Sequence, residues 1–145
     1  MGTGHADDII TLVDTAGRRL AAVGAAEAGV RPAPGKWSRK EVLGHLVDSA
    51  LNNHQRFVRA ELAESLEFPG YAQADWVRCQ DYAAVDWQAL VELWTAVNRH
   101  LAHVVRRIPE AKLAVPCRIG GGAAMSLEGL VADYLRHVRH HLARI

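Results

Sequence analysis

Residues 36–50 read KWSRKEVLGHLVDSA, and this stretch decides the fold class. Ser38 and Glu41 form the S-x-x-E capping box that begins many helices, because each side chain accepts a hydrogen bond from a backbone N–H that the helix leaves free. Apolar residues then recur at helical spacing, at Val42, Leu46, Ala50 and Phe57. This period is that of an amphipathic α-helix, and it predicts a helix from about residue 38 to about residue 64.

The same helical period is found in three further stretches. They cover about residues 8–28, 87–108 and 126–145. No stretch alternates apolar and polar residues as a half-buried strand does, so no strand is expected. Four helices of roughly 20 residues, with a long connection over residues 65–86 between the second and the third, predict an all-α four-helix bundle. We expect this bundle to fill a single domain, residues 1–145.

The connection over residues 65–86 holds no period and is rich in aromatic residues. It contains Tyr71, Trp76 and Tyr82, and a short helix is expected around residues 74–82. Long connections in compact domains often serve as lids or binding loops. These rings are therefore candidates for covering a substrate, and the alternative is that they only cap the bundle.

The composition excludes several classes of function. Lys and Arg number 17 and Asp and Glu number 16, so the net charge of +1 gives no basic field for a general nucleic-acid binder. No apolar run approaches the roughly 20 residues of a membrane span, and the first residues do not resemble a secretory signal. The two cysteines form no C-x-x-C motif, which fits a reducing cytoplasm. We expect a cytoplasmic protein that acts on a small molecule and binds neither nucleic acid nor membrane.

The eight histidines are the unusual feature of the composition. His137 and His141 are four residues apart, so their rings lie on one helix face and could share a metal ion. Histidine pairs also occur on solvated faces, and the spacing alone leaves both interpretations open. His45 lies at the edge of the apolar arc of the second helix. It could supply a third ligand from another helix, or be an ordinary exposed or hydrogen-bonded histidine.

Three histidines with an open coordination position are typical of catalytic metal sites. Each ring then needs a partner for its second nitrogen, and Asp48 and Asp133 each lie about one helical turn from one of these histidines. Either carboxylate could equally be a surface charge. Asn52 and Arg56 continue the edge of the second helix beyond His45 and could orient an anionic substrate. No residue is assigned as the catalytic group.

Two motifs together resemble the DinB-like (YfiT-like) superfamily. Residues 36–50 resemble its second helix, and residues 133–142, DYLRHVRHHL, are similar to its closing helix. Residues 52–57, NNHQRF, look like one DinB subgroup. The resemblance implies an up-down-down-up four-helix bundle with a divalent metal ion, zinc or nickel, near one end. The ligands that it implies are His45, His137 and His141.

The resemblance also sets the functional alternatives. Members of the superfamily include thiol S-transferases, maleylpyruvate isomerases that use a low-molecular-weight thiol, and many presumed metal-dependent hydrolases; homodimers are frequent among them. Thiol S-transfer or a related detoxification of a small molecule is the leading interpretation, with a low-molecular-weight thiol as a second cofactor. The alternatives are a metal-dependent hydrolase and a non-catalytic helical module that binds a metal or a ligand, because a shared fold does not choose among reactions.

Overall fold

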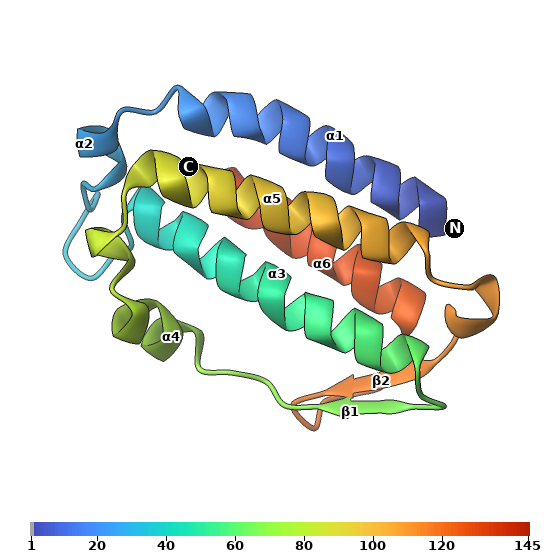
Figure 1. Cartoon of the computed structure of the whole chain (residues 1–145). Helices are drawn as coiled ribbons and strands as arrows, with labels where there is room; N and C mark the ends of the chain where they lie inside the picture. The colour runs from blue at the N-terminus through green and yellow to red at the C-terminus, as the bar shows by residue number, and fades with distance from the viewer. Residues whose placement is uncertain (1) are drawn as a thin grey trace.

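Four long helices lie side by side and form the body of the protein (Figure 1). The computed structural model describes residues 2–145. The long helices are α1 (Gly2–Ala21), α3 (Arg39–Glu61), α5 (Trp87–Arg106) and α6 (Leu127–Leu142). The expected four-helix bundle is therefore confirmed.

The first helix differs from its expected range. α1 ends at Ala21, and a separate single turn, α2 (Ala25–Ala28), follows it. Gly24 separates the two with an extended backbone, φ −69° and ψ 146°. Glycine favours a helix less than any other residue except proline, and this preference explains the break that the apolar period did not indicate.

The capping box begins α3 as expected. The Ser38 hydroxyl accepts a hydrogen bond from the Glu41 N–H at 3.1 Å, and the Glu41 carboxylate accepts one from the Ser38 N–H at 3.0 Å. Glu41 also accepts a hydrogen bond from Arg31 at 2.8 Å, which ties the preceding connection to the helix. The start of α3 is thus fixed two turns before His45.

Three short strands correct the expectation that the chain has none. β1 (Leu66–Phe68) pairs in parallel with β2 (Pro116–Ile119), and β2 pairs antiparallel with β3 (Met125–Ser126). Strands of two to four residues are too short for an alternating pattern to register. The pair β1 and β2 lies beside the end of α3 (Figure 1).

Buried polar contacts fix how the helices sit against one another. The Trp87 indole N–H donates a hydrogen bond to the Leu20 carbonyl at 3.1 Å and joins α5 to α1. The Tyr134 hydroxyl on α6 donates to the Asn98 side chain on α5. Within residues 2–145, no helix has the length and apolar content that crossing a membrane requires.

The connection between α3 and α5 contains the expected short helix, α4 (Gln73–Gln80), and a 3₁₀ turn over Tyr82–Ala84. Tyr82 is buried, and its ring lies directly against the backbone of α3 at Gly44. A Cβ atom at position 44 would overlap that ring. Gly44 therefore allows the connection to lie close to α3, one residue before His45.

We expect the Gly44→Ala variant to be destabilised by about 1–3 kcal/mol in urea unfolding, because the new methyl group forces Tyr82 away. Gly17→Ala on α1 is the matched control, since its nearest neighbour would be 3.7 Å from the new Cβ. That variant should be unchanged or more stable by up to about 1 kcal/mol. Equal effects of the two substitutions would contradict the proposed packing.

Candidate metal centre

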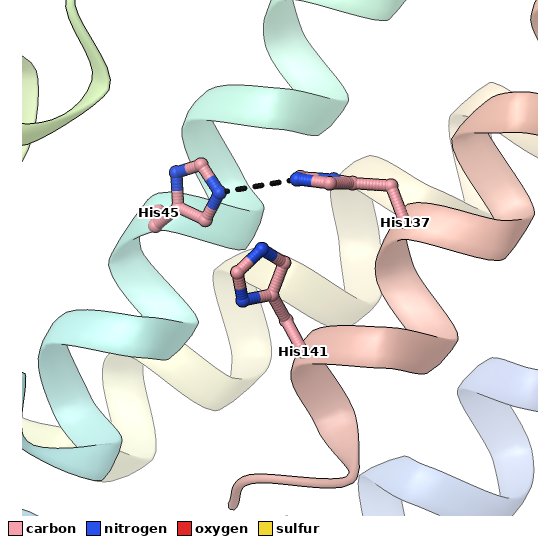
Figure 2. Close-up of side chains that lie close together, drawn as sticks. All are labelled: His45, His137 and His141. Carbon is pink, nitrogen blue, oxygen red and sulfur yellow. Dashed lines mark hydrogen bonds between the residues drawn. The ribbon is translucent and has the colours of Figure 1, made fainter.

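Three histidines from two helices meet where α3 begins and α6 ends (Figure 2). His45 comes from α3, and His137 and His141 come from consecutive turns of α6. One nitrogen from each ring lies within 4.8 Å of the other two. The Nε2 atoms of His45 and His137 are 3.4 Å apart. Two nitrogens bound to one tetrahedral ion at about 2.0–2.1 Å are separated by about 3.4 Å, so this distance suits a shared ion.

Burial keeps these rings uncharged at neutral pH. His45 is 0% exposed, and burial, followed by the neighbouring His141 and His137, lowers the pKa of His45 to about 4. Burial and the neighbouring His137 lower the pKa of His141 to about 4 as well. Burial also lowers the pKa of His137. Neutral imidazole is the form that binds metal ions.

Ser49, rather than the expected Asp133, lies beside the second ring nitrogen of His137. The Ser49 hydroxyl is 3.4 Å from His137 Nδ1, a contact that suits a proton on Nδ1 and leaves Nε2 free as a ligand. The Asp133 carboxylate instead accepts two hydrogen bonds from Arg136, at 3.1 and 2.6 Å. Ser49 is four residues after His45, and this helical spacing was the signal in the sequence that could have indicated it.

Asp48 also differs from its expected role. Its carboxylate accepts hydrogen bonds from the Tyr82 hydroxyl at 2.6 Å and the Gln80 amide at 2.9 Å. Within residues 2–145 it has no hydrogen bond to His45, whose buried Nδ1 has no partner. Burial raises the pKa of Asp48, and the two donors oppose that shift. Asp48 thus holds the end of α4 and the following turn against α3.

The three side chains fit a divalent transition-metal ion. Three neutral imidazoles whose nitrogens lie within 4.8 Å of one another form a donor set that suits zinc, nickel or copper. The Nε2 atom of the buried His45 ring faces His137, and within residues 2–145 the Nδ1 atom of the same ring has no hydrogen-bond partner. No carboxylate belongs to the group, so the charge of a bound ion would not be compensated.

Two clefts reach the histidine group, each at a different histidine. The first, here called the polar cleft, has a volume of about 270 Å³ and reaches His137. Its other polar lining residues are Ser49, Asn53, Arg56, Tyr71, Gln73, Asp133 and Tyr134. The second, here called the Trp37 cleft, has a volume of about 450 Å³ and reaches His141. Its lining also includes Trp37, Val42 and Ala74, with Lys36 and Arg144 as the basic residues.

The structure separates the expected substrate-binding residues. Arg56 and Tyr71 line the polar cleft. Asn52 does not line it, and Asn53, one residue further along α3, lines the cleft in its place. The amide of each residue donates a hydrogen bond to the carbonyl four residues earlier, at 2.9 Å for Asn52 and 2.8 Å for Asn53. Trp76 is 38% exposed and packs on Tyr71 with ring centroids 4.8 Å apart.

The chain belongs to the DinB superfamily, whose family model matches residues 14–145. Among curated proteins, it is 23% identical over 109 residues to a "Putative metal-dependent hydrolase" of Halalkalibacterium halodurans, covering 75% of this chain and 63% of that protein. A protein of the same name from Bacillus licheniformis is 27% identical over 115 residues, covering 77% of this chain and 64% of that protein. The chain therefore spans less than two thirds of the length of these relatives.

Solved structures show the same fold. YfiT from Bacillus subtilis, described as a probable metal-dependent hydrolase with an unusual four-helix bundle topology, superposes with a TM-score of 0.80 at 20% identity. The match covers 97% of this chain and 83% of YfiT. A mycothiol-dependent maleylpyruvate isomerase superposes with a TM-score of 0.74 at 18% identity, covering 95% of this chain and 59% of the isomerase.

We expect Tyr82→Phe to lower the free energy of unfolding by about 1.5–3 kcal/mol, because the buried Asp48 carboxylate loses a hydrogen-bond donor. Tyr71→Phe is the matched control in the same connection and should change stability by no more than about 0.5 kcal/mol. Urea unfolding of both variants measures the difference. A Tyr82→Phe variant as stable as the unaltered protein would show that Asp48 does not depend on this hydroxyl.

Proposed function

We propose that this chain is a divalent-metal-dependent enzyme acting on a small molecule, with His45, His137 and His141 as the metal ligands. The observation that carries the proposal is the meeting of three neutral imidazoles at a point that two clefts reach. The names of the curated relatives support a metal-dependent activity. The donor set and the family favour zinc or nickel.

The surrounding residues would each have a defined role. A divalent ion at this site would supply Lewis acidity and would lower the pKa of a bound thiol or water. Ser49 would fix the orientation of the His137 ring through Nδ1. Tyr71 remains a neutral hydrogen-bond donor, since burial raises its pKa to about 12. The buried His45 would attach a bound ion to α3.

Thiol S-transfer is the leading reaction because the histidine group borders two clefts. A transfer reaction brings together two substrates, and the polar cleft and the Trp37 cleft give each of them a separate approach to the rings of His137 and His141. The fold that the chain shares with a mycothiol-dependent isomerase is compatible with a low-molecular-weight thiol as one of the two.

Hydrolysis is the second candidate, supported by the names of the curated relatives and of YfiT. It needs only one organic substrate and water. A non-catalytic module that binds a metal or a ligand is the remaining alternative. The three candidates differ in what the metal-loaded protein turns over, and thus can be distinguished directly.

We expect the purified protein to bind about one zinc or nickel ion per chain. His45→Ala, His137→Ala and His141→Ala should each weaken binding by more than about 100-fold, because each removes a direct ligand. Metal content after dialysis and competition with a chromophoric chelator measure this. His140→Ala is the matched control, since this exposed neighbour on α6 should leave affinity unchanged. Full metal binding by His45→Ala would contradict the assignment.

We expect zinc- or nickel-loaded protein to join a low-molecular-weight thiol to monochlorobimane. Fluorescence of the product measures the rate, which should fall at least about 100-fold in His137→Ala. His140→Ala should keep the full rate. Cleavage of ester or amide probes without added thiol would favour the hydrolase instead. Tight metal binding without turnover of any probe would favour the non-catalytic module.

A further inference from the structure

We propose that the polar cleft beside His137 binds the carboxylate group of a small organic substrate and that Arg56 recognises it. This inference rests on the proposed function and deepens it, because it names the chemical class of the substrate.

Arg56 is 9% exposed, and within residues 2–145 its guanidinium forms neither an ion pair nor a hydrogen bond. Its Nε is buried without a partner. Two more exposed arginines of the same chain are paired: Arg99 with Asp14 and Arg106 with Asp7, each at 2.8 Å. The buried arginine is thus unpaired while more exposed ones are paired, which reverses the usual arrangement.

An unpaired buried charge costs stability, so the fold alone does not account for Arg56. The guanidinium carbon lies 5.6 Å from the centroid of the Phe68 ring, a cation–π contact that uses none of its five N–H donors. Arg56 lines the polar cleft together with His137. Its donors are therefore available to a ligand that also reaches the metal centre.

The charges around the cleft favour an anion. Asp133 is the acidic residue in the lining, and its carboxylate already accepts two hydrogen bonds from Arg136. Tyr71 is neutral at pH 7, and burial raises its pKa further, to about 12. Asp133 attracts Arg56 electrostatically, but within residues 2–145 it forms no ion pair with Arg56. The guanidinium therefore keeps its donors for a ligand, and a bound divalent ion would add positive charge to the cleft.

The size and the donors of the cleft favour a carboxylate over a phosphate. The planar guanidinium fork matches the oxygens of either a carboxylate or a phosphate, but a single cation balances the one charge of a carboxylate and not the two charges of a phosphate dianion. Arg56 is the one Lys or Arg in the lining. The volume of about 270 Å³ equals that of about nine water molecules, which is enough for a small carboxylic acid. The amide of Asn53 and the hydroxyl of Ser49 also face this space.

The test measures binding of three simple probes by ligand-observed NMR titration at constant ionic strength. The probes are propionate, its neutral isostere propionamide, and inorganic phosphate. Each is titrated into zinc-loaded protein and into protein stripped of metal by a chelator. We expect propionate to bind both forms and propionamide and phosphate to bind at least about tenfold more weakly.

Arg56→Gln should weaken propionate binding by about tenfold or more, and Arg56→Lys, which keeps the charge but loses the fork, by less. Arg59→Gln is the matched control. Arg59 is exposed, lies one turn further along α3, and also faces the Phe68 ring, at 6.0 Å. This variant should bind propionate as the unaltered protein does.

A folding defect can be separated from loss of binding with Arg56→Met. Because the guanidinium has no hydrogen bond to lose, this variant should unfold at the same temperature as the unaltered protein or higher, while losing propionate binding. Unchanged propionate binding by Arg56→Gln or Arg56→Met, equal loss in Arg59→Gln, or equal binding of propionamide would overturn the proposal. So would tighter binding of phosphate than of propionate.

The same titrations distinguish this proposal from the proposed function. If the chain binds no metal, the metal-stripped protein still reports whether Arg56 binds propionate. If it binds metal and propionate binding is insensitive to Arg56, the metal centre stands and the carboxylate site fails. Metal affinity should be unaffected in Arg56→Gln, because Arg56 is not one of the proposed ligands.

Discussion

Three imidazole rings this close together cannot all carry a positive charge, and this constraint governs the candidate site. His45 is fully buried, so a positive charge on its ring would be neither solvated nor balanced by a carboxylate within the group. Neutral rings with lone pairs pointing at a common centre gain most from a shared cation. A bound metal ion would therefore stabilise this arrangement, whereas three such rings packed together without an ion would cost free energy.

The rest of the bundle keeps α3 and α6 in the register that this site needs. Trp87 joins α5 to α1, and Tyr134 joins α6 to α5, each through a buried hydrogen bond. Gly44 lets Tyr82 approach α3, and Tyr82 then donates to Asp48. The connection between α3 and α5 is in this way fixed near the histidines, and the polar cleft forms beneath it.

Much of the fold could be predicted from the sequence, because long helices carry a strong periodic signal. The capping box at Ser38 fixed the start of α3 correctly. The strands could not be predicted, since each has only two to four residues and the pairing of β1 with β2 joins segments about fifty residues apart. The end of α1 was not predicted, because the apolar residues near Gly24 continue the helical period.

Those features of the site that follow from helical spacing could be predicted from the sequence. Four-residue spacing indicated that His137 and His141 share a face, but only the resemblance to the DinB family joined His45 to them. Details that depend on rotation by a single residue were not predictable. One residue turns a helix by about 100°, which is the difference between Asn52, outside the polar cleft, and Asn53, in its lining.

X-ray absorption at the zinc edge of the zinc-loaded protein, together with anomalous diffraction from its crystals, tests the central claim most directly. The account predicts one ion bound by about three imidazole nitrogens at about 2.0–2.1 Å, with its density between His45, His137 and His141. An ion held by other residues, or three rings that point apart at saturating zinc and nickel, would contradict it.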